Sequence, residues 1–108
     1  MRVVNLLASL PDALPNEVFE TLFSGRDVRI ERIISQGQCS PVGFWYNQPQ
    51  TEWIVVLQGN PKLQIEGEEQ ARLLRPGDCL LLLPHVRHRV EWTSPDEPTV
   101  WLAVHVGE

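Results

Sequence analysis

The sequence predicts an all-β fold, an antiparallel barrel or sandwich preceded by a short N-terminal helix. The pattern of short strands and the need to protect their edges predict this architecture. From residue 28 onward, short segments with alternating polar and apolar residues follow one another, and turns rich in Gly, Pro, Asn and Asp separate them. Closure or double layering of the sheet is then needed, because it protects the edges of so many short strands.

Length and composition indicate one domain. The chain has 108 residues, of which 43% are hydrophobic, enough to bury a core but too few for a second one. We expect residues 1–27 to form an N-terminal strand or helix extension and residues 28–108 to form the barrel.

The N-terminal helix is expected between about Pro15 and Phe23. Pro15-Asn16 is a typical start signal, and apolar residues at Val18, Phe19, Leu22 and Phe23 recur on one helical face. Gly25 is placed to cap the end of such a helix.

Strands are expected from the alternation of polar and apolar residues and from the turns between them. The stretch Cys79–Leu83 is continuously apolar, which is typical of a strand buried on both faces. The expected strands are 28–33, 52–58, 62–66, 70–74, 79–83, 88–93 and 100–106.

The charge of the chain argues against several classes of partner, and its cysteines indicate the compartment. The formal net charge is −5 and no run of Lys or Arg occurs, which argues against nucleic acid and anionic membranes as partners. The longest apolar stretch is far too short for a membrane-spanning helix. Cys39 and Cys79 lie far apart, and no basic segment precedes an apolar signal core, so we expect a reduced, cytoplasmic setting.

The stretch 56–90 carries Val56-Leu57-Gln58-Gly59, then Arg75-Pro76-Gly77-Asp78, and finally His88-Arg89-Val90, in which His88 stands eleven residues after Gly77. This stretch resembles the cupin superfamily, which implies an antiparallel jelly-roll barrel (double-stranded β-helix). In the first cupin motif two His, separated by one residue, usually precede a Glu and then a Gly. Here Glu52 and Gly59 match the second half of that motif.

The first half of the motif departs from the family. Depending on the gap, the two His positions fall on Trp45 and Asn47 or on Tyr46 and Gln48. In the second motif, Leu83 stands where a Pro is usual.

The resemblance implies a site for one divalent transition metal, Fe, Ni, Mn or Zn. Of the four residues that hold a metal in cupins, this sequence keeps Glu52 and His88, whereas such a metal needs three or four donors. His85 is the candidate third ligand if its turn folds over the barrel mouth, and His105 is a further candidate if it faces inward. The alternative for His88 is a buried ring that only hydrogen-bonds a carbonyl.

Glu52 is the most informative single residue. Strand alternation puts it on one face with Ile54 and Val56, and a carboxylate on an apolar face is unfavourable unless it is paired, protonated or metal-bound. The alternative is a strand-end Glu that solvent still reaches, or one that pairs with Arg87 or Arg89.

Aromatic and amide side chains predict a small-molecule pocket at the barrel mouth. Trp45, Tyr46 and Gln48 stand at or beside the missing His positions, and Trp92 shares the face of His88. The Tyr46 hydroxyl is a candidate general acid. The alternative is that these rings only fill the core.

Two functions follow as hypotheses. The first is a metal-dependent enzyme that acts on a small polar metabolite, with Glu52 and His88 as ligands and Tyr46 as the acid. The second is a metal-free cupin that binds a small molecule without turning it over.

A homodimer is expected from the other face of the Glu52 strand. Trp53, Val55 and Leu57 form an apolar row there, and a monomeric barrel would expose it. The alternative is that the N-terminal helix packs over this row.

Overall fold

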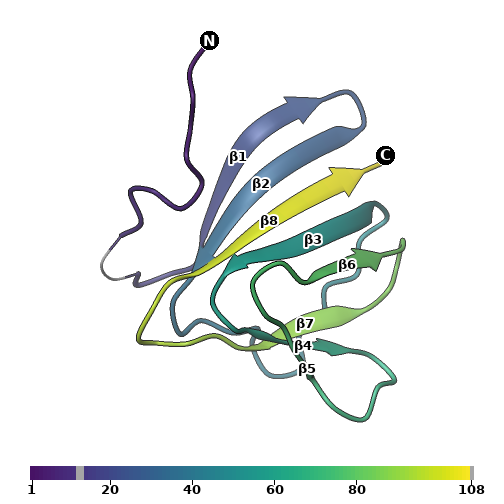
Figure 1. Cartoon of the computed structure of the whole chain (residues 1–108). Helices are drawn as coiled ribbons and strands as arrows, with labels where there is room; N and C mark the ends of the chain where they lie inside the picture. The colour runs from purple at the N-terminus through teal and green to yellow at the C-terminus, as the bar shows by residue number, and fades with distance from the viewer. Residues whose placement is uncertain (12–13, 108) are drawn as a thin grey trace.

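The computed structural model describes residues 1–11 and 14–107, and it arranges their strands in two antiparallel sheets (Figure 1). The larger sheet has the order β1-β2-β8-β3-β6 and the smaller sheet the order β5-β4-β7. The all-β prediction is confirmed. The strands are β1 (Val18–Gly25), β2 (Val28–Ser35), β3 (Thr51–Gln58), β4 (Lys62–Ile65), β5 (Arg72–Leu73), β6 (Cys79–Leu82), β7 (His88–Trp92) and β8 (Thr99–Val106).

The predicted N-terminal helix is wrong, because residues 18–25 form strand β1. This strand pairs with β2 from Val18 opposite Ile34 to Gly25 opposite Val28. Its β-branched and aromatic residues suit a strand as well as a helix face, and here the available sheet edge decides between the two. Gly25 therefore does not cap a helix; it ends β1 just before the tight turn into β2.

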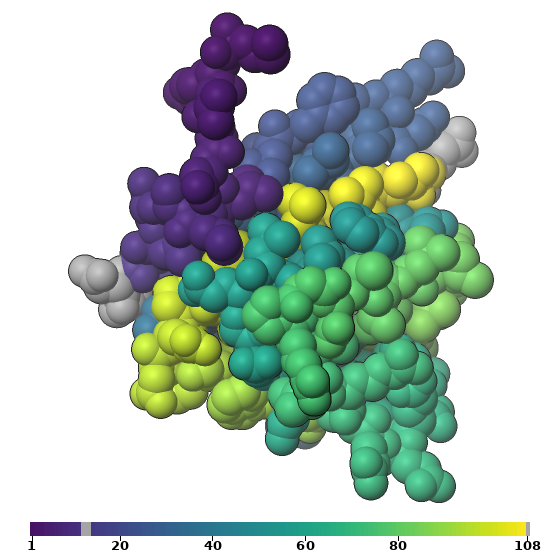
Figure 2. Space-filling view, viewed as in Figure 1, coloured from purple at the N-terminus to yellow at the C-terminus, as the bar shows by residue number. Residues whose placement is uncertain are grey.

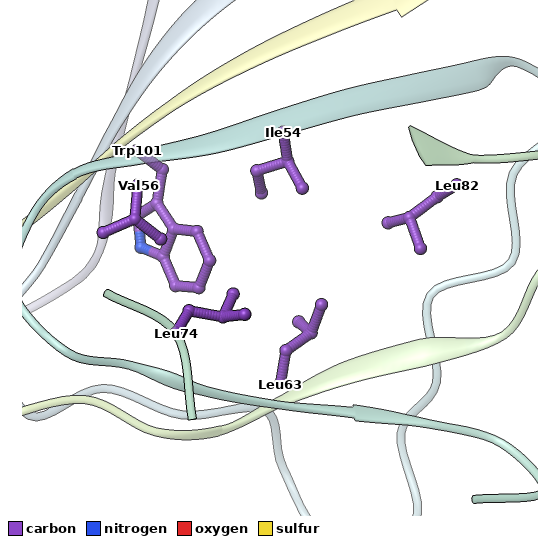
Figure 3. Packing of buried hydrophobic residues seen from close by; sticks show 6 residues of the cluster. All are labelled: Ile54, Val56, Leu63, Leu74, Leu82 and Trp101. Carbon is purple, nitrogen blue, oxygen red and sulfur yellow. The ribbon is translucent and has the colours of Figure 1, made fainter. Parts of the chain in front are cut away.

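The core lies between the two sheets (Figure 3). Ile54, Val56 and Trp101 extend from the larger sheet toward Leu63 and Leu74 on the side of the smaller sheet. Trp101 is only 1% exposed. Replacing a buried residue of this size by Ala typically costs about 3–5 kcal/mol of folding stability, so this layer supplies much of the folding energy.

Strand β6 is not buried on both faces, which corrects a second expectation. It pairs only with β3 and forms an edge of the larger sheet. Its side chains alternate: Leu82 is buried, whereas Cys79 and Leu81 are exposed. The continuous apolar run therefore supplies two surfaces: an inner face that packs in the core, and a second apolar face on the outside of the sheet.

The first residues of the chain extend away from the two sheets (Figure 2). Met1 and Val3 are almost fully exposed, whereas the backbone carbonyls of Leu6 and Ala8 accept hydrogen bonds from Arg32 on β2. Within the described ranges, no helix is long and apolar enough to cross a membrane.

Gly59 is the position where a side chain is least tolerated in the barrel. Its φ is +94°, and an added Cβ would lie 2.7 Å from Thr99 Oγ1 and 3.1 Å from Thr99 Cα. Gly59→Ala is expected to lower the free energy of unfolding by about 2 kcal/mol or more, through backbone strain and this clash. Urea unfolding measures the loss.

Gly77→Ala is the matched control for this prediction. Gly77 has nearly the same φ, +92°, but an added Cβ would have nothing within 4 Å. It should lose stability by strain alone, about 1 kcal/mol. Equal losses for the two variants would contradict the close approach of Gly59 to Thr99.

Candidate functional site

A small pocket lies at one end of the space between the sheets. Its volume is about 60 Å³, and its walls are mostly apolar, with Leu63, Val90 and Trp101 among them. The polar side chains that line it are Glu17, Tyr46, Gln48, Glu52, His88 and His105. About 10–15 Å³ of such volume holds one water molecule, so the pocket has room for a few waters or for a group of a few heavy atoms.

Strand register brings the main polar groups together. Glu52 on β3 lies directly opposite His105 on β8, and cross-strand partners project from the same face of a sheet. His88 begins β7 in the other sheet, so its ring approaches Glu52 from across the barrel.

The segment before β3 decides between the two placements of the missing motif histidines. Tyr46 and His88 form an isolated antiparallel bridge, with Tyr46 N donating to His88 O at 2.7 Å. Tyr46 and Gln48 line the pocket, whereas Trp45 and Asn47 do not. The residues at the two His positions are therefore Tyr46 and Gln48.

The Glu52 carboxylate is buried and surrounded by polar partners. It is 5% exposed, and Gln48 Nε2 donates to Glu52 Oε1 at 2.7 Å. His88 Nε2 lies 3.4 Å from Oε1, and His105 Nε2 lies 3.8 Å from Oε2. The arginines considered as partners point elsewhere, since Arg87 pairs with Glu66 and Arg89 with Glu91.

His88 is fixed by its second ring nitrogen. His88 Nδ1 lies 2.9 Å from the carbonyl oxygen of Val86, which can only accept, so Nδ1 carries a proton. Nε2 is thereby directed at the Glu52 carboxylate. The ring of Tyr46 stacks on His88 with centroids 5.4 Å apart.

Burial and neighbouring charges shift the pKa values of three groups at the site. Burial lowers the pKa of His88, but the contacts with Glu52 and with the Val86 carbonyl outweigh burial and leave this pKa above its usual 6.5. Burial raises the pKa of Tyr46, and the charges of Glu17 and Glu52 raise it further. Burial also raises the pKa of Glu17, although the hydroxyl of Ser35 donates to its carboxylate.

Three residues predicted for the site lie away from the pocket lining. His85 is exposed, has a φ of 65°, and places Nδ1 2.8 Å from Asn47 Oδ1. The Arg87 guanidinium lies over the ring of Trp45, 5.9 Å from its centroid. Trp92 is 43% exposed at the far end of β7. The structure thus does not bring His85, Trp45 or Trp92 to Glu52 and His88.

Glu31 and Glu17 were missing from the site predicted from sequence, and His105 was named there only as a further candidate ligand if it faces inward. His105 faces inward, and its Nε2 lies 3.0 Å from Glu31 Oε1. Glu31 lies on the inward face of β2, and Glu17 enters the pocket just before β1. The alternation of polar and apolar residues along 100–106 and 28–33 was the signal that His105 and Glu31 face inward. The register of β8 against β2 and β3 was also needed to align these two residues with Glu52. Glu17 was not recognised as a candidate because it fell within the predicted N-terminal helix.

The donors do not make a metal centre as they stand. Within residues 1–11 and 14–107, no group of three or more His, Cys, Asp or Glu side chains is arranged to hold a metal ion. The two motif positions hold a phenol and an amide, and the amide nitrogen of Gln48 is directed at Glu52. His105 Nε2 is in contact with Glu31. This donor set does not fit the four-ligand site that the resemblance implies.

The two-layered barrel and its inward His and Glu define the class to which the chain belongs. The family model for the cupin domain matches residues 33–105, so this protein is a member of the cupin superfamily. The search of curated proteins returns no match.

Solved structures resemble the chain over nearly its whole length. One from Ralstonia eutropha JMP134, named a "putative mannose-6-phosphate isomerase", is 48% identical, with 100% of each chain covered and a TM-score of 0.96. An RmlC-like cupin from Desulfovibrio desulfuricans is 22% identical, with 97% and 96% covered and a TM-score of 0.72. A DMSP lyase from Ruegeria pomeroyi DSS-3 is 20% identical over 99% of this chain and 55% of that one, also with a TM-score of 0.72. The last two show the fold alone.

The His88–Glu52 contact predicts the titration of His88. Its imidazole should titrate above pH 6.5, and Glu52→Gln should lower this pKa because the negative charge is removed. A raised folded-state pKa means that the protonated ring stabilises the fold fully below the unfolded pKa, and that this stability is lost as pH rises through the folded pKa. Ring-proton NMR across pH 5–9 measures the shift. A His88 pKa that Glu52→Gln leaves unchanged would contradict the pairing.

Proposed function

We propose that this cupin binds a small polar metabolite in the pocket and that His88, paired with Glu52, moves a proton on it without a bound metal. One observation carries the proposal: His88 Nε2 lies 3.4 Å from Glu52 Oε1 at the polar end of an otherwise apolar pocket. Both side chains are only 7% exposed. A buried titratable group with a shifted pKa, such as His88, that lies in a cavity beside a charged partner is typical of sites for proton transfer.

The proton transfer uses the Nε2 of His88. In its neutral form this nitrogen takes a proton from the ligand, the Glu52 carboxylate stabilises the imidazolium, and the imidazolium, after exchange with solvent, returns a proton to the same or a neighbouring atom of the ligand. An imidazole is suited to act as base and then as acid, and the contact with Glu52 raises the pKa of His88, which favours the imidazolium that this step forms. Tyr46, stacked on His88, orients the ligand through its hydroxyl.

The Ralstonia relative supports the reaction class in part. An isomerase that interconverts an aldose and a ketose moves a proton between adjacent carbons, and this needs one acid–base group and no external oxidant. The phosphate in that relative's name has no such support here, because none of the described residues that line the pocket is a Lys or Arg.

A metal-dependent enzyme is the second candidate, and one observation favours it. The Nε2 atoms of both His88 and His105 lie within 3.8 Å of the Glu52 carboxylate. A Fe, Ni, Mn or Zn ion bound by Glu52, His88 and His105 would act as a Lewis acid, but His105 would first have to leave Glu31.

Solvent exchange tests the proton transfer. Wild type in D2O, given a panel of aldoses, ketoses and amino sugars, should exchange the C–H next to the carbonyl of at least one member. His88→Gln should slow this exchange by about 10²-fold or more, because it lacks the base. Proton NMR of the panel follows the exchange. If no member exchanges faster with wild type than with His88→Gln, the proton-transfer proposal is wrong.

Metal content separates the two candidates. Protein purified without a His-tag or chelating resin should carry far less than one equivalent of Fe, Ni, Mn or Zn, and His88→Gln should carry the same trace. Elemental analysis after dialysis is the measurement. One equivalent in wild type that His88→Gln loses would favour the metal-dependent enzyme instead.

We also propose that the outer face of the larger sheet pairs with a second copy of this chain. One row of apolar side chains crosses all five strands at one level, each residue directly opposite the next: Phe23, Ile30, Val104, Trp53 and Leu81. Phe23 and Leu81 are more than half exposed, and Trp53 is 38% exposed. A face that is continuous and self-complementary suits isologous pairing.

Charge on this outer face supports the second copy as its occupant. The neighbouring level carries Glu20 paired with Arg32, so the face is locally neutral although the chain carries −5. Two copies would therefore meet here without bringing like charges together. The N-terminal segment contacts this level through the carbonyls of Leu6 and Ala8, which accept from Arg32, and no helix covers the apolar row within the described residues.

Trp53→Glu tests the pairing. It puts a charge at the centre of the apolar row, so light scattering at tens of micromolar should show a dimer for wild type and a monomer for the variant. Trp92→Glu is the matched control, since Trp92 is also half-exposed but lies in the smaller sheet. A monomeric wild type, or a Trp53→Glu variant that stays dimeric, would contradict the proposal.

Charge and cysteines support the remaining expectations. The net charge of −5 supports a protein without nucleic-acid or membrane partners. The free, exposed Cys39 and Cys79 support a reducing, cytoplasmic setting.

A further inference from the structure

We infer that the pocket receives the ammonium end of a small primary amine and disfavours carboxylate and phosphate ligands. This inference rests on the proposed binding function of the pocket, and it specifies the chemical class of the ligand.

The first argument is the balance of charge. Glu17 and Glu52 line the pocket, whereas Glu31, which contacts His105, also lies 3.5 Å from Arg29 Nε and is balanced by it. As long as no more than one of His88 and His105 is protonated, the two lining carboxylates exceed the imidazolium charge. None of the described residues that line the pocket is a Lys or Arg, so an anion would meet excess negative charge and a cation would neutralise it.

The second argument is hydrogen-bond complementarity. Two donors of the site are already directed at carboxylates: Gln48 Nε2 at Glu52, and His105 Nε2 at Glu31. Because carboxylates only accept, His105 carries its proton on Nε2. In the neutral ring Nδ1 is then an acceptor, and it is buried without a hydrogen-bond partner among the described residues. A polar end rich in acceptors is matched by an ammonium group, which has three donors.

The third argument is size and wall chemistry. A volume of about 60 Å³ admits only a few heavy atoms, which corresponds to a terminal aminomethyl group. Tyr46 and Trp101 are among the lining residues, and aromatic rings favour nearby cations. Leu63 and Val90 supply the apolar surface for the attached carbon.

A charge series of nearly equal size tests the inference. Ethylammonium carries one positive charge, ethanol is neutral, and acetate carries one negative charge. Inorganic phosphate is added as a larger anion. NMR titration of the ring signals of Tyr46 and His88 at constant pH and ionic strength measures each dissociation constant. Ethylammonium is expected to bind at least about tenfold more tightly than acetate or phosphate.

Two variants assign the effect to the pocket. Glu52→Gln should weaken ethylammonium binding by about tenfold, because the amide keeps the shape but removes the charge. Glu17→Gln, at a less buried position, should weaken it less and provides a second test if Glu52→Gln does not fold. Glu66→Gln is the control, since Glu66 is exposed and pairs with Arg87 outside the pocket. It should leave binding unchanged.

The outcomes separate this inference from the proposed function. Binding of acetate or phosphate as tight as that of ethylammonium would overturn the ligand class. If ethanol alone binds and Glu52→Gln weakens that binding, the pocket function stands and the amine does not. If no probe binds in a way that depends on Glu52 or Glu17, both the ligand class and the binding function of the pocket are wrong.

Discussion

Burial of the Glu52 carboxylate is the constraint on which the arrangement of the pocket depends. An ionised carboxylate loses several kcal/mol of hydration when it enters a protein interior, and only partners held at short range restore that loss. Here Gln48 donates to one oxygen, His88 faces the same oxygen, and His105 faces the other. Each partner comes from a different segment, so the carboxylate couples three parts of the chain that are far apart in sequence.

The two-sheet architecture supplies these partners at fixed positions. Pairing of β3 with β8 puts His105 opposite Glu52, and pairing of β8 with β2 brings Glu31 within reach of His105. The bridge between Tyr46 and His88 ties the segment before β3 to the smaller sheet. Beneath these groups the apolar layer around Trp101 excludes water, which strengthens every electrostatic interaction above it. The same sheet that orients Glu52 inward turns Trp53 outward, so one strand serves both the pocket and the proposed contact between copies.

The strands and the motif were readable from the sequence because they depend on local patterns. Alternation located β2, β3, β4, β7 and β8 to within two residues of their ends, and the spacing between Gly77 and His88 identified the superfamily. The first strand was missed, since Val18 to Phe23 fit a helix face as well as a strand, and only the free edge of β2 selects the strand.

The site was only half predictable, and the missing half depends on tertiary pairing. Glu52 and His88 followed from the motif, and Tyr46 and Gln48 followed once the direction of their side chains was known. The contact of Glu31 with His105 spans 74 residues of sequence and exists only through the register of β2 and β8. His85 illustrates the reverse error: it lies three residues from His88, but its positive φ directs it toward Asn47.

A double-mutant cycle on Glu52 and His88 tests the central claim, that a paired buried carboxylate organises the pocket. Wild type, Glu52→Gln, His88→Gln and the double variant would be unfolded in urea at pH 6, where the protonated His88 contributes most. We expect a favourable coupling energy of about 1–3 kcal/mol between the two side chains, as for groups in direct contact within one polar network. A coupling energy of zero, with the two losses simply adding, would show that Glu52 does not depend on His88 and would contradict this account.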